Sequence, residues 1–214
     1  MSLQSHNGFD YIINGHLAGP ASPMLLLHKT GGDERELLGF ADQVAPDRPL
    51  IAVRGPVVED GKHRFFRRIS AGVFDEEDLR RRTHDLAELL KVIAQRHGSH
   101  SPVALGLSNG ANIAAALLLL HPESLSGAAL LRPACPFADL PDASLADKPV
   151  LVVAGAGDTT VPARETDRLV AHLAANGAVV TSKTIDAGHR MTDGDAPAVQ
   201  AWLHLHASQS RKAI

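Results

Sequence analysis

Residues 101–116 read Ser-Pro-Val-Ala-Leu-Gly-Leu-Ser-Asn-Gly-Ala-Asn-Ile-Ala-Ala-Ala. The apolar run that begins at Val103 predicts a buried strand, and the alanine-rich segment from Ala111 is a strong helix former. Between them, residues 106–110 match the pattern Gly-x-Ser-x-Gly. The two glycines leave room for a sharp strand-to-helix turn that holds the hydroxyl of Ser108 clear of the carboxyl end of the strand, as a nucleophile requires. The alternative is an ordinary Gly/Ser turn in which Ser108 caps the helix.

The rest of the chain repeats this alternation of strand and helix. Because parallel neighbours cannot be joined by a tight hairpin, the alternation predicts parallel strands linked by right-handed crossovers. The runs are nearly continuous in apolar residues, which is typical of strands covered by helices on both faces. We therefore expect an α/β fold with a mostly parallel, doubly wound sheet. The expected strands are Met24–His28, Leu50–Arg54, Val103–Leu107, Gly127–Leu131, Val150–Ala154 and Val179–Ile185, and the expected helices are Glu34–Val44, Glu76–Arg96, Ala111–Leu120, Ala163–Ala175 and Ala196–His206.

Composition agrees with one globular domain. The chain has 214 residues, 44% of them hydrophobic and 21% charged, with a formal net charge of −3. We expect a single domain over residues 9–207, with flexible termini at 1–8 and 208–214. This charge balance gives no reason to expect nucleic acid as a partner.

The apolar runs and the cysteine content indicate the compartment. The longest apolar run, Ile113–Leu120, is far shorter than the roughly 20 residues that span a bilayer, so no membrane insertion is expected. The N-terminal residues do not resemble a secretory signal. The lone Cys135 fits a reducing interior, where it would pack as a small hydrophobe. We expect a cytoplasmic protein.

A serine nucleophile needs a base, and the base needs a carboxylate that fixes its tautomer. In this kind of α/β fold the three residues follow the order Ser, acid, His. After Ser108, the acid that follows a strand directly is Asp158, and the histidine on a strand-to-helix loop is His189. Because the carboxyl ends of parallel strands share one edge of a sheet, these side chains are expected to meet there. Alternatively, Asp158 only caps the helix announced by Val161-Pro162.

The 12 histidines do not predict a metal site. His204 and His206 are two residues apart on an expected helix, so they face different directions, and no third ligand is evident. We expect neither a metal nor an organic cofactor.

Acyl transfer also needs donors for the developing oxyanion. One is the backbone N–H that follows the nucleophile, here Asn109, and another comes from the loop after an early strand, here Thr30. The supporting segment is Leu25–Glu34, a strand that runs into a Gly-rich turn. Asp33 is well placed there as the cap of the next helix.

These motifs resemble those of the small bacterial carboxylesterase/phospholipase family of α/β hydrolases, which is related to acyl-protein thioesterases and dienelactone hydrolases. The resemblance extends from about residue 25 to residue 203. It implies a compact hydrolase without a large lid domain, with Ser108, Asp158 and His189 as catalytic triad and carboxylic esters of modest acyl length as substrates. Besides the segments already quoted, it rests on Val53-Arg54-Gly55-Pro56, Arg64–Arg68, Gly72–Leu79, Leu131-Arg132-Pro133 and Gly188-His189.

The oxyanion loop departs from the family pattern at one residue. The family commonly has His-Gly-Thr-Gly-Gly at the oxyanion loop, whereas this chain has His28-Lys29-Thr30-Gly31-Gly32. Lysine adopts left-handed conformations only at a cost that glycine does not have. Lys29 is therefore expected either to shift the loop or to add a positive charge near the oxyanion or a substrate carboxylate.

The loop Val57–Phe74 is the expected wall of the substrate pocket. It leaves a strand at the catalytic edge and carries Phe65, Phe66 and Phe74, which either line the site together with Lys29 or anchor the loop to the body. Three further side chains in this region, Arg64, Arg67 and Arg68, are expected to pair with the acidic stretch 75–78 rather than to bind substrate.

The sequence thus predicts a serine hydrolase that cleaves small-molecule esters through an acyl-enzyme. Two alternatives remain: a thioesterase or lysophospholipase acting on longer acyl chains, and a catalytically silent ligand-binding protein with the same fold. A homodimer through an edge strand or the last helix is a further possibility.

Overall fold

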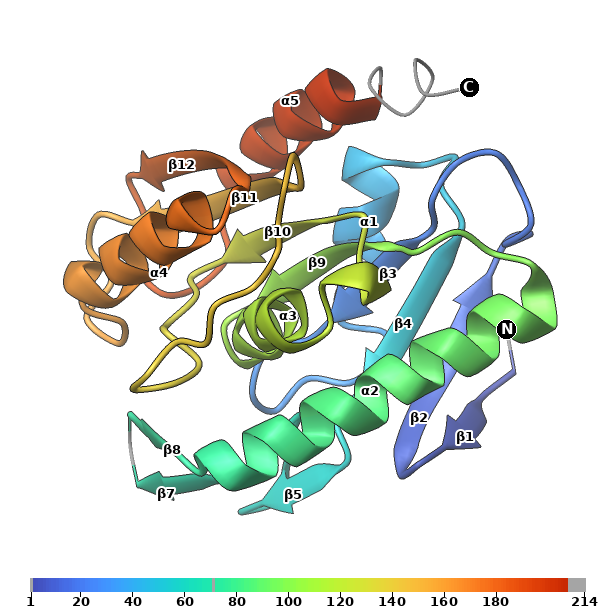
Figure 1. Ribbon diagram of the computed structural model, residues 1–214, viewed down its shortest axis with the longest axis horizontal. Helices are drawn as coiled ribbons and strands as arrows, with labels where there is room; N and C mark the ends of the chain where they lie inside the picture. Colours follow the sequence, from blue (N-terminus) through green and yellow to red (C-terminus); the bar gives the residue numbers. More distant parts are fainter. Residues whose placement is uncertain (1, 71, 208–214) are drawn as a thin grey trace.

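The computed structural model describes residues 2–70 and 72–207. Its centre is one eight-stranded sheet with strand order β1-β2-β4-β3-β9-β10-β11-β12 (Figure 1). The six strands from β4 to β12 in this order are mutually parallel. Strand β2 pairs antiparallel with β4, and β1 pairs antiparallel with β2. The strands are β1 (Gln4–His6), β2 (Phe9–Asn14), β3 (Met24–Leu27), β4 (Leu50–Arg54), β9 (Val103–Leu107), β10 (Gly127–Leu131), β11 (Pro149–Gly155) and β12 (Val179–Ile185).

Helices cover both faces of this sheet. On one face lie α2 (Glu76–His97), α3 (Asn109–Leu120) and α4 (Ala163–Ala175), and on the other lie α1 (Leu38–Val44) and α5 (Asp195–Ala207) (Figure 1). Alternate strand residues divide between two hydrophobic cores: Leu25 and Leu27 face α2 and α3, whereas Met24 and Leu26 face α1 and α5. The central strands β3, β4, β9, β10 and β11 are therefore apolar on both sides, as their sequences indicate. The expected α/β fold with a mostly parallel, doubly wound sheet is confirmed.

The first two strands of the sheet were not predicted from the sequence. They form a hairpin in which Gln4 pairs with Tyr11 and His6 with Phe9. Asn7 and Gly8 both have positive φ, 49° and 82°, as a two-residue hairpin turn requires, and Asn-Gly is a strong signal for that turn. The described part of the segment 1–8 is thus part of the sheet, which corrects the expectation of a flexible N-terminus. Residues 208–214, expected to be flexible, lie outside the described residues.

Helix α1 begins later than its sequence suggests. The expected helix starts at residue 34, but Asp33 accepts a hydrogen bond from the backbone N–H of Arg35 at 2.8 Å and does not cap a helix. Such a local side-chain bond favours a turn over a helix. The segment therefore passes through successive turns before α1 begins at Leu38.

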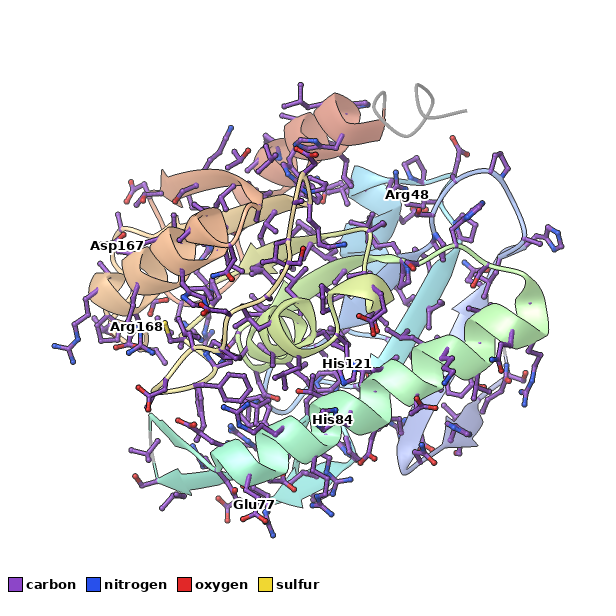
Figure 2. The ribbon with its side chains drawn as sticks, viewed as in Figure 1. Arg48, Glu77, His84, His121, Asp167 and Arg168 are labelled. Atoms are coloured by element: carbon purple, nitrogen blue, oxygen red, sulfur yellow. The ribbon has the colours of Figure 1, made fainter. Side chains whose placement is uncertain are left out.

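Helix α2 begins and ends where the sequence provides the signals. The side chain of Asp75 caps its first turn by accepting from the N–H of Asp78 at 3.0 Å, and Gly98 ends it with φ 63°. The helix contacts the end of α3 through two imidazoles: Nδ1 of His84 lies 2.6 Å from Nε2 of His121 (Figure 2). Among the described residues, no helix is long and apolar enough to cross a membrane.

The segment between β4 and α2 is not an irregular loop. It folds into two small antiparallel sheets, one made of β5 (Val57–Glu59) and β6 (Lys62–Arg64), the other of β7 (Arg68–Ser70) and β8 (Val73–Phe74). This segment, residues 55–70 and 72–75, is called the arm, and it lies beside the N-terminal end of α2 (Figure 1).

Candidate active site

Ser108 lies at the turn between β9 and α3, at the carboxyl edge of the sheet. Its backbone has φ 52° and ψ −112°, outside the usual regions for a residue with a side chain. The turn is fixed on both sides, because the N–H of Ser108 donates to the carbonyl of Leu131 at 2.9 Å and its carbonyl accepts from the N–H of Asn112 at 2.9 Å. The strained conformation and the strand–turn–helix setting are those of a nucleophile elbow.

The loops after β11 and β12 bring an acid and a base to this serine. Nε2 of His189 lies 2.8 Å from Oγ of Ser108, and Nδ1 of His189 lies 2.8 Å from Oδ2 of Asp158. An ionised carboxylate only accepts hydrogen bonds, so Nδ1–H donates to Asp158 and Nε2 is left to accept from the serine hydroxyl. Three residues separated by up to 81 positions thus form one hydrogen-bonded chain.

The environment of Asp158 keeps its carboxylate ionised. Burial by itself would raise its pKa, but the N–H groups of Val161 and Thr160 and the imidazole of His189 outweigh that effect, so the pKa of Asp158 lies below 3.8. The two N–H groups donate to Oδ1 at 3.0 and 2.8 Å, which leaves Oδ2 for the histidine. Asp158 therefore holds the loop before α4 and contacts the imidazole of His189. It does not cap α4, because the N-cap residue is Pro162 and the helix has no side-chain cap hydrogen bond.

Two backbone N–H groups, those of Asn109 and Thr30, are the expected donors to an oxyanion. Asn109 is the first residue of α3, and N–H groups in the first turn of a helix have no acceptor within the helix. In the oxyanion loop, the N–H of Lys29 donates to Glu36 and the N–H of Gly31 to the carbonyl of His63. Of these three consecutive loop residues, Thr30 is the one whose N–H has no acceptor among the hydrogen bonds of residues 2–70 and 72–207.

The buried imidazole of His28 is hydrogen-bonded to this loop. Its Nδ1 lies 2.6 Å from the carbonyl of Lys29, and its Nε2 accepts from the N–H of Gly55 at 2.9 Å. Burial lowers the pKa of His28 from 6.5 to about 4, only partly offset by the hydrogen bond to Lys29. The imidazole is thus neutral at pH 7, with Nδ1–H as donor, and joins the oxyanion loop to the end of β4.

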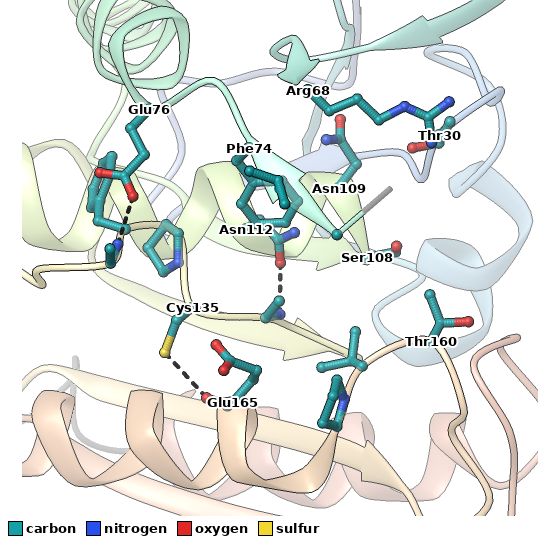
Figure 3. A pocket seen from close by; sticks show the side chains of 18 of the residues that line it. Thr30, Arg68, Phe74, Glu76, Ser108, Asn109, Asn112, Cys135, Thr160 and Glu165 are labelled. Carbon is teal, nitrogen blue, oxygen red and sulfur yellow. Dashed lines mark hydrogen bonds between the residues drawn. The ribbon is translucent and has the colours of Figure 1, made fainter. Parts of the chain in front are cut away.

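A cavity of about 750 Å³ opens in front of the serine. Thr30, Asn109 and Ser108 lie toward one end of it, and Cys135 and Glu165 lie toward the other (Figure 3). Of the expected pocket residues, Lys29 and Phe74 line this cavity. Its lining includes both charged and apolar side chains.

Phe65 and Phe66 correct the expectation for the pocket wall. Both are completely buried, and both belong to the hydrophobic core on the α2 and α3 face rather than to the cavity lining. The N–H of Phe65 donates to Oδ1 of Asn109 at 2.7 Å, and the ring of Phe66 packs edge-on against Phe74 at 5.1 Å between centroids. The two rings anchor the arm so that Phe74 reaches the cavity.

Lys29 is accommodated without a left-handed backbone. Among the described residues, those other than glycine with positive φ are Asn7, Asp60, Ser108, Arg132 and Asp147, so Lys29 is not one of them. The positive φ of this loop occurs at Gly31. The ammonium of Lys29 forms an ion pair with Glu36, which balances its charge beside the cavity.

Two of the three arginines of the arm have partners other than those expected. Arg67 pairs with Asp75 at 2.9 Å, as predicted. Arg64 and Arg68 instead share Glu59, at 3.5 and 3.2 Å. These two arginines line the cavity, and Arg64 also donates from Nη1 to Oγ1 of Thr30 at 3.0 Å.

Cys135 lines the far end of the cavity, which sequence reasoning did not predict. Its Sγ lies 3.2 Å from the carbonyl of Glu165 (Figure 3). Nε of Arg168, a residue of α4 (Figure 2), lies 3.1 Å from the same sulfur. Burial raises the pKa of the Cys135 thiol above 9.0, although Arg168 acts in the opposite direction. The side chain is therefore a neutral thiol within the pocket wall. Within the described ranges, no group of three His, Cys, Asp or Glu side chains is arranged to hold a metal ion.

A mostly parallel sheet flanked by helices, with a serine at a strained turn on its carboxyl edge, defines an α/β hydrolase. No protein-family model matches the chain. It is 39% identical over 181 residues to MhqD of Bacillus subtilis (strain 168), a protein named as a hydrolase, and the match covers 84% of this chain and 90% of MhqD.

Two solved carboxylesterase structures have the same fold as this chain. The Bacillus cereus carboxylesterase superposes with a TM-score of 0.89 at 37% identity, covering 93% of this chain and 95% of that one. A carboxylesterase from Mesorhizobium loti superposes with a TM-score of 0.89 at 35% identity, covering 95% and 98%. The chain belongs to this carboxylesterase family of α/β hydrolases and is a carboxylic ester hydrolase, which confirms the resemblance seen in the sequence.

Proposed function

We propose that the enzyme cleaves carboxylic esters through an acyl-enzyme on Ser108, with His189 as general base and acid and Asp158 as the group that orients the histidine. The observation that carries this proposal is the continuous chain of two 2.8 Å hydrogen bonds from Oγ of Ser108 through the imidazole to the carboxylate. Distances of this length are within reach for proton transfer.

The steps follow from this geometry. Oγ of Ser108 attacks the ester carbonyl carbon while Nε2 of His189 takes the hydroxyl proton. The carbonyl oxygen becomes an oxyanion, which accepts hydrogen bonds from the N–H groups of Thr30 and Asn109. His189 then protonates the leaving alcohol, and a water activated by the same histidine hydrolyses the acyl-enzyme and restores the serine. Asp158 stabilises the imidazolium in both halves of the reaction.

We also propose esters of modest acyl length as substrates. The cavity of about 750 Å³ is of the size that encloses a small organic molecule. Its lining includes charged side chains, among them Lys29, Arg64 and Glu165, and these are costly to cover with a long hydrocarbon chain. The competing proposal, a thioesterase or lysophospholipase, uses the same residues with a longer apolar groove.

Hydrolysis of a p-nitrophenyl ester series, from acetate to palmitate, tests this choice. We expect kcat/KM to be highest for the short chains and to fall as the chain lengthens, with no activity in Ser108→Ala. Activity that rises toward palmitate, or a preference for a matched acyl thioester, would favour the competing proposal. Ligand binding without turnover in a folded wild type would favour the silent binding protein.

The lone, buried Cys135 further supports the proposal that the enzyme acts in the reducing cytoplasm.

A further inference from the structure

A fully buried ion pair lies beside the candidate triad without being part of it. Arg132 follows β10 and has φ 54°, and its N–H donates to the carbonyl of Val153 at 2.8 Å. Its guanidinium forms a two-point contact with Asp195, the first residue of α5: Nη1 lies 2.7 Å from Oδ1 and Nη2 lies 3.0 Å from Oδ2. Both side chains are 0% exposed.

The same guanidinium holds the loop that carries His189. Nε donates to the carbonyl of Gly188 at 2.9 Å, and Nη2 donates to the carbonyl of Arg190 at 3.4 Å. One rigid, planar group thus contacts the residue before and the residue after the histidine. Asp195 fixes the other end of the loop, because its Oδ2 accepts from the N–H of Thr192 at 2.8 Å.

Arg132 directly follows β10, and this position connects it to the turn of Ser108 as well as to the loop of His189. Strand β10 lies between β9, which ends directly before Ser108, and β11, which precedes Asp158. The N–H of Ser108 donates to the carbonyl of Leu131, the residue directly before Arg132. The turn of the serine and the loop of the histidine are therefore both fixed to one short segment, residues 131–132.

We propose that Arg132 is a positioning residue: it holds His189 at hydrogen-bond distance from Ser108. Asp195 in turn holds the guanidinium of Arg132 in place. The inference rests on the proposed roles of Ser108 and His189. A buried ion pair generally adds little stability compared with apolar side chains of similar volume, so fold stability alone is a weak reason for this pair. Orientation of the reacting groups is a stronger one, since a displacement of 1 Å can reduce the rate about 100-fold.

The test compares Arg132→Met with Arg132→Lys. Methionine removes all the loop hydrogen bonds, whereas lysine keeps the charge but cannot contact Asp195 and both loop carbonyls in the same plane. We expect kcat on a short p-nitrophenyl ester to fall roughly 10- to 100-fold in Arg132→Met and less in Arg132→Lys, with KM changed less than about threefold, because the cavity lining is untouched. In proton NMR, the downfield signal of the His189 Nδ1–H should shift or broaden in both variants.

Ile93→Ala provides the matched control. Ile93 is 1% exposed in α2 and belongs to the hydrophobic core, so its loss lowers stability without touching residues 188–195. We expect Ile93→Ala to keep the wild-type kcat and the downfield signal at a temperature where circular dichroism shows it folded.

Asp195→Asn keeps the proposal falsifiable should Arg132→Met fail to fold. It retains the size of the side chain but leaves the guanidinium without its counter-charge, and we expect the same selective loss of kcat. Folded Arg132 or Asp195 variants with wild-type kcat and an unchanged signal would overturn the inference alone. A wild type without Ser108-dependent activity would overturn the proposed function, and this inference with it.

Discussion

Acid should destabilise this enzyme through His28, the buried histidine under the oxyanion loop. Its pKa is about 4 in the folded protein, against 6.5 for the ordinary side chain. Because the folded value is the lower one, the unfolded chain takes up the proton first as the pH falls. The contribution of neutral His28 to the free energy of unfolding is therefore complete above about pH 6.5, declines between pH 6.5 and 4, and is lost below pH 4. At about 1.4 kcal/mol per pH unit, the whole effect is about 3.5 kcal/mol, of which about 3 kcal/mol is lost by pH 4.

Urea unfolding from pH 7 to pH 4 measures this effect when the wild type is compared with His28→Gln. Glutamine can supply one acceptor and one donor but does not titrate. We expect the free energy of unfolding of the wild type to approach that of the variant as the pH falls, with the difference changing by about 3 kcal/mol.

His16→Gln, which removes an exposed imidazole, controls for the substitution itself. Parallel stability curves for the wild type and His28→Gln would refute the reasoning. Because a protonated Nε2 cannot accept from the N–H of Gly55, ester hydrolysis should also decline over the lower part of this range while the protein is still folded.

Three further substitutions test other parts of the site. Asp158→Asn should reduce kcat by about 10³- to 10⁴-fold in steady-state assays, because the amide does not hold His189 in the active tautomer; a loss below about tenfold would contradict the assignment. Gly110→Ala should lower the free energy of unfolding by about 3 kcal/mol in urea titrations, since a Cβ would overlap the carbonyls of Leu27 and His28; an unchanged midpoint would contradict this close approach. Lys29→Gly should change kcat/KM for neutral and anionic esters by similar, less than about threefold factors, because Glu36 already balances the ammonium; a selective loss on anionic esters would instead support a direct role of Lys29.

The sequence was sufficient to predict the six parallel strands of the sheet and the loops that carry Ser108, Asp158 and His189. The reason is that the central strands are buried on both faces, so their apolar runs are hard to confuse with loops. Four of the expected strands have the observed bounds: Leu50–Arg54, Val103–Leu107, Gly127–Leu131 and Val179–Ile185. The strand and the turn then fix where each loop residue leaves the sheet.

What the sequence did not predict depends on pairings between distant segments. Phe65 and Phe66 look like pocket residues until the arm folds back and buries them against the core. Arg132 is one charged residue after a strand, and only the tertiary fold brings Asp195 to it. The hairpin of β1 and β2 is the exception, because Asn7-Gly8 is a local signal that the sequence does contain.

Covalent labelling tests the central claim most directly. The wild type and Ser108→Ala are treated with a fluorophosphonate probe, and the modified peptide is located by mass spectrometry. The account predicts one label, on the peptide that contains Ser108, and none in the folded Ser108→Ala variant. A folded wild type that takes up no label, or a label located on another residue, would contradict it.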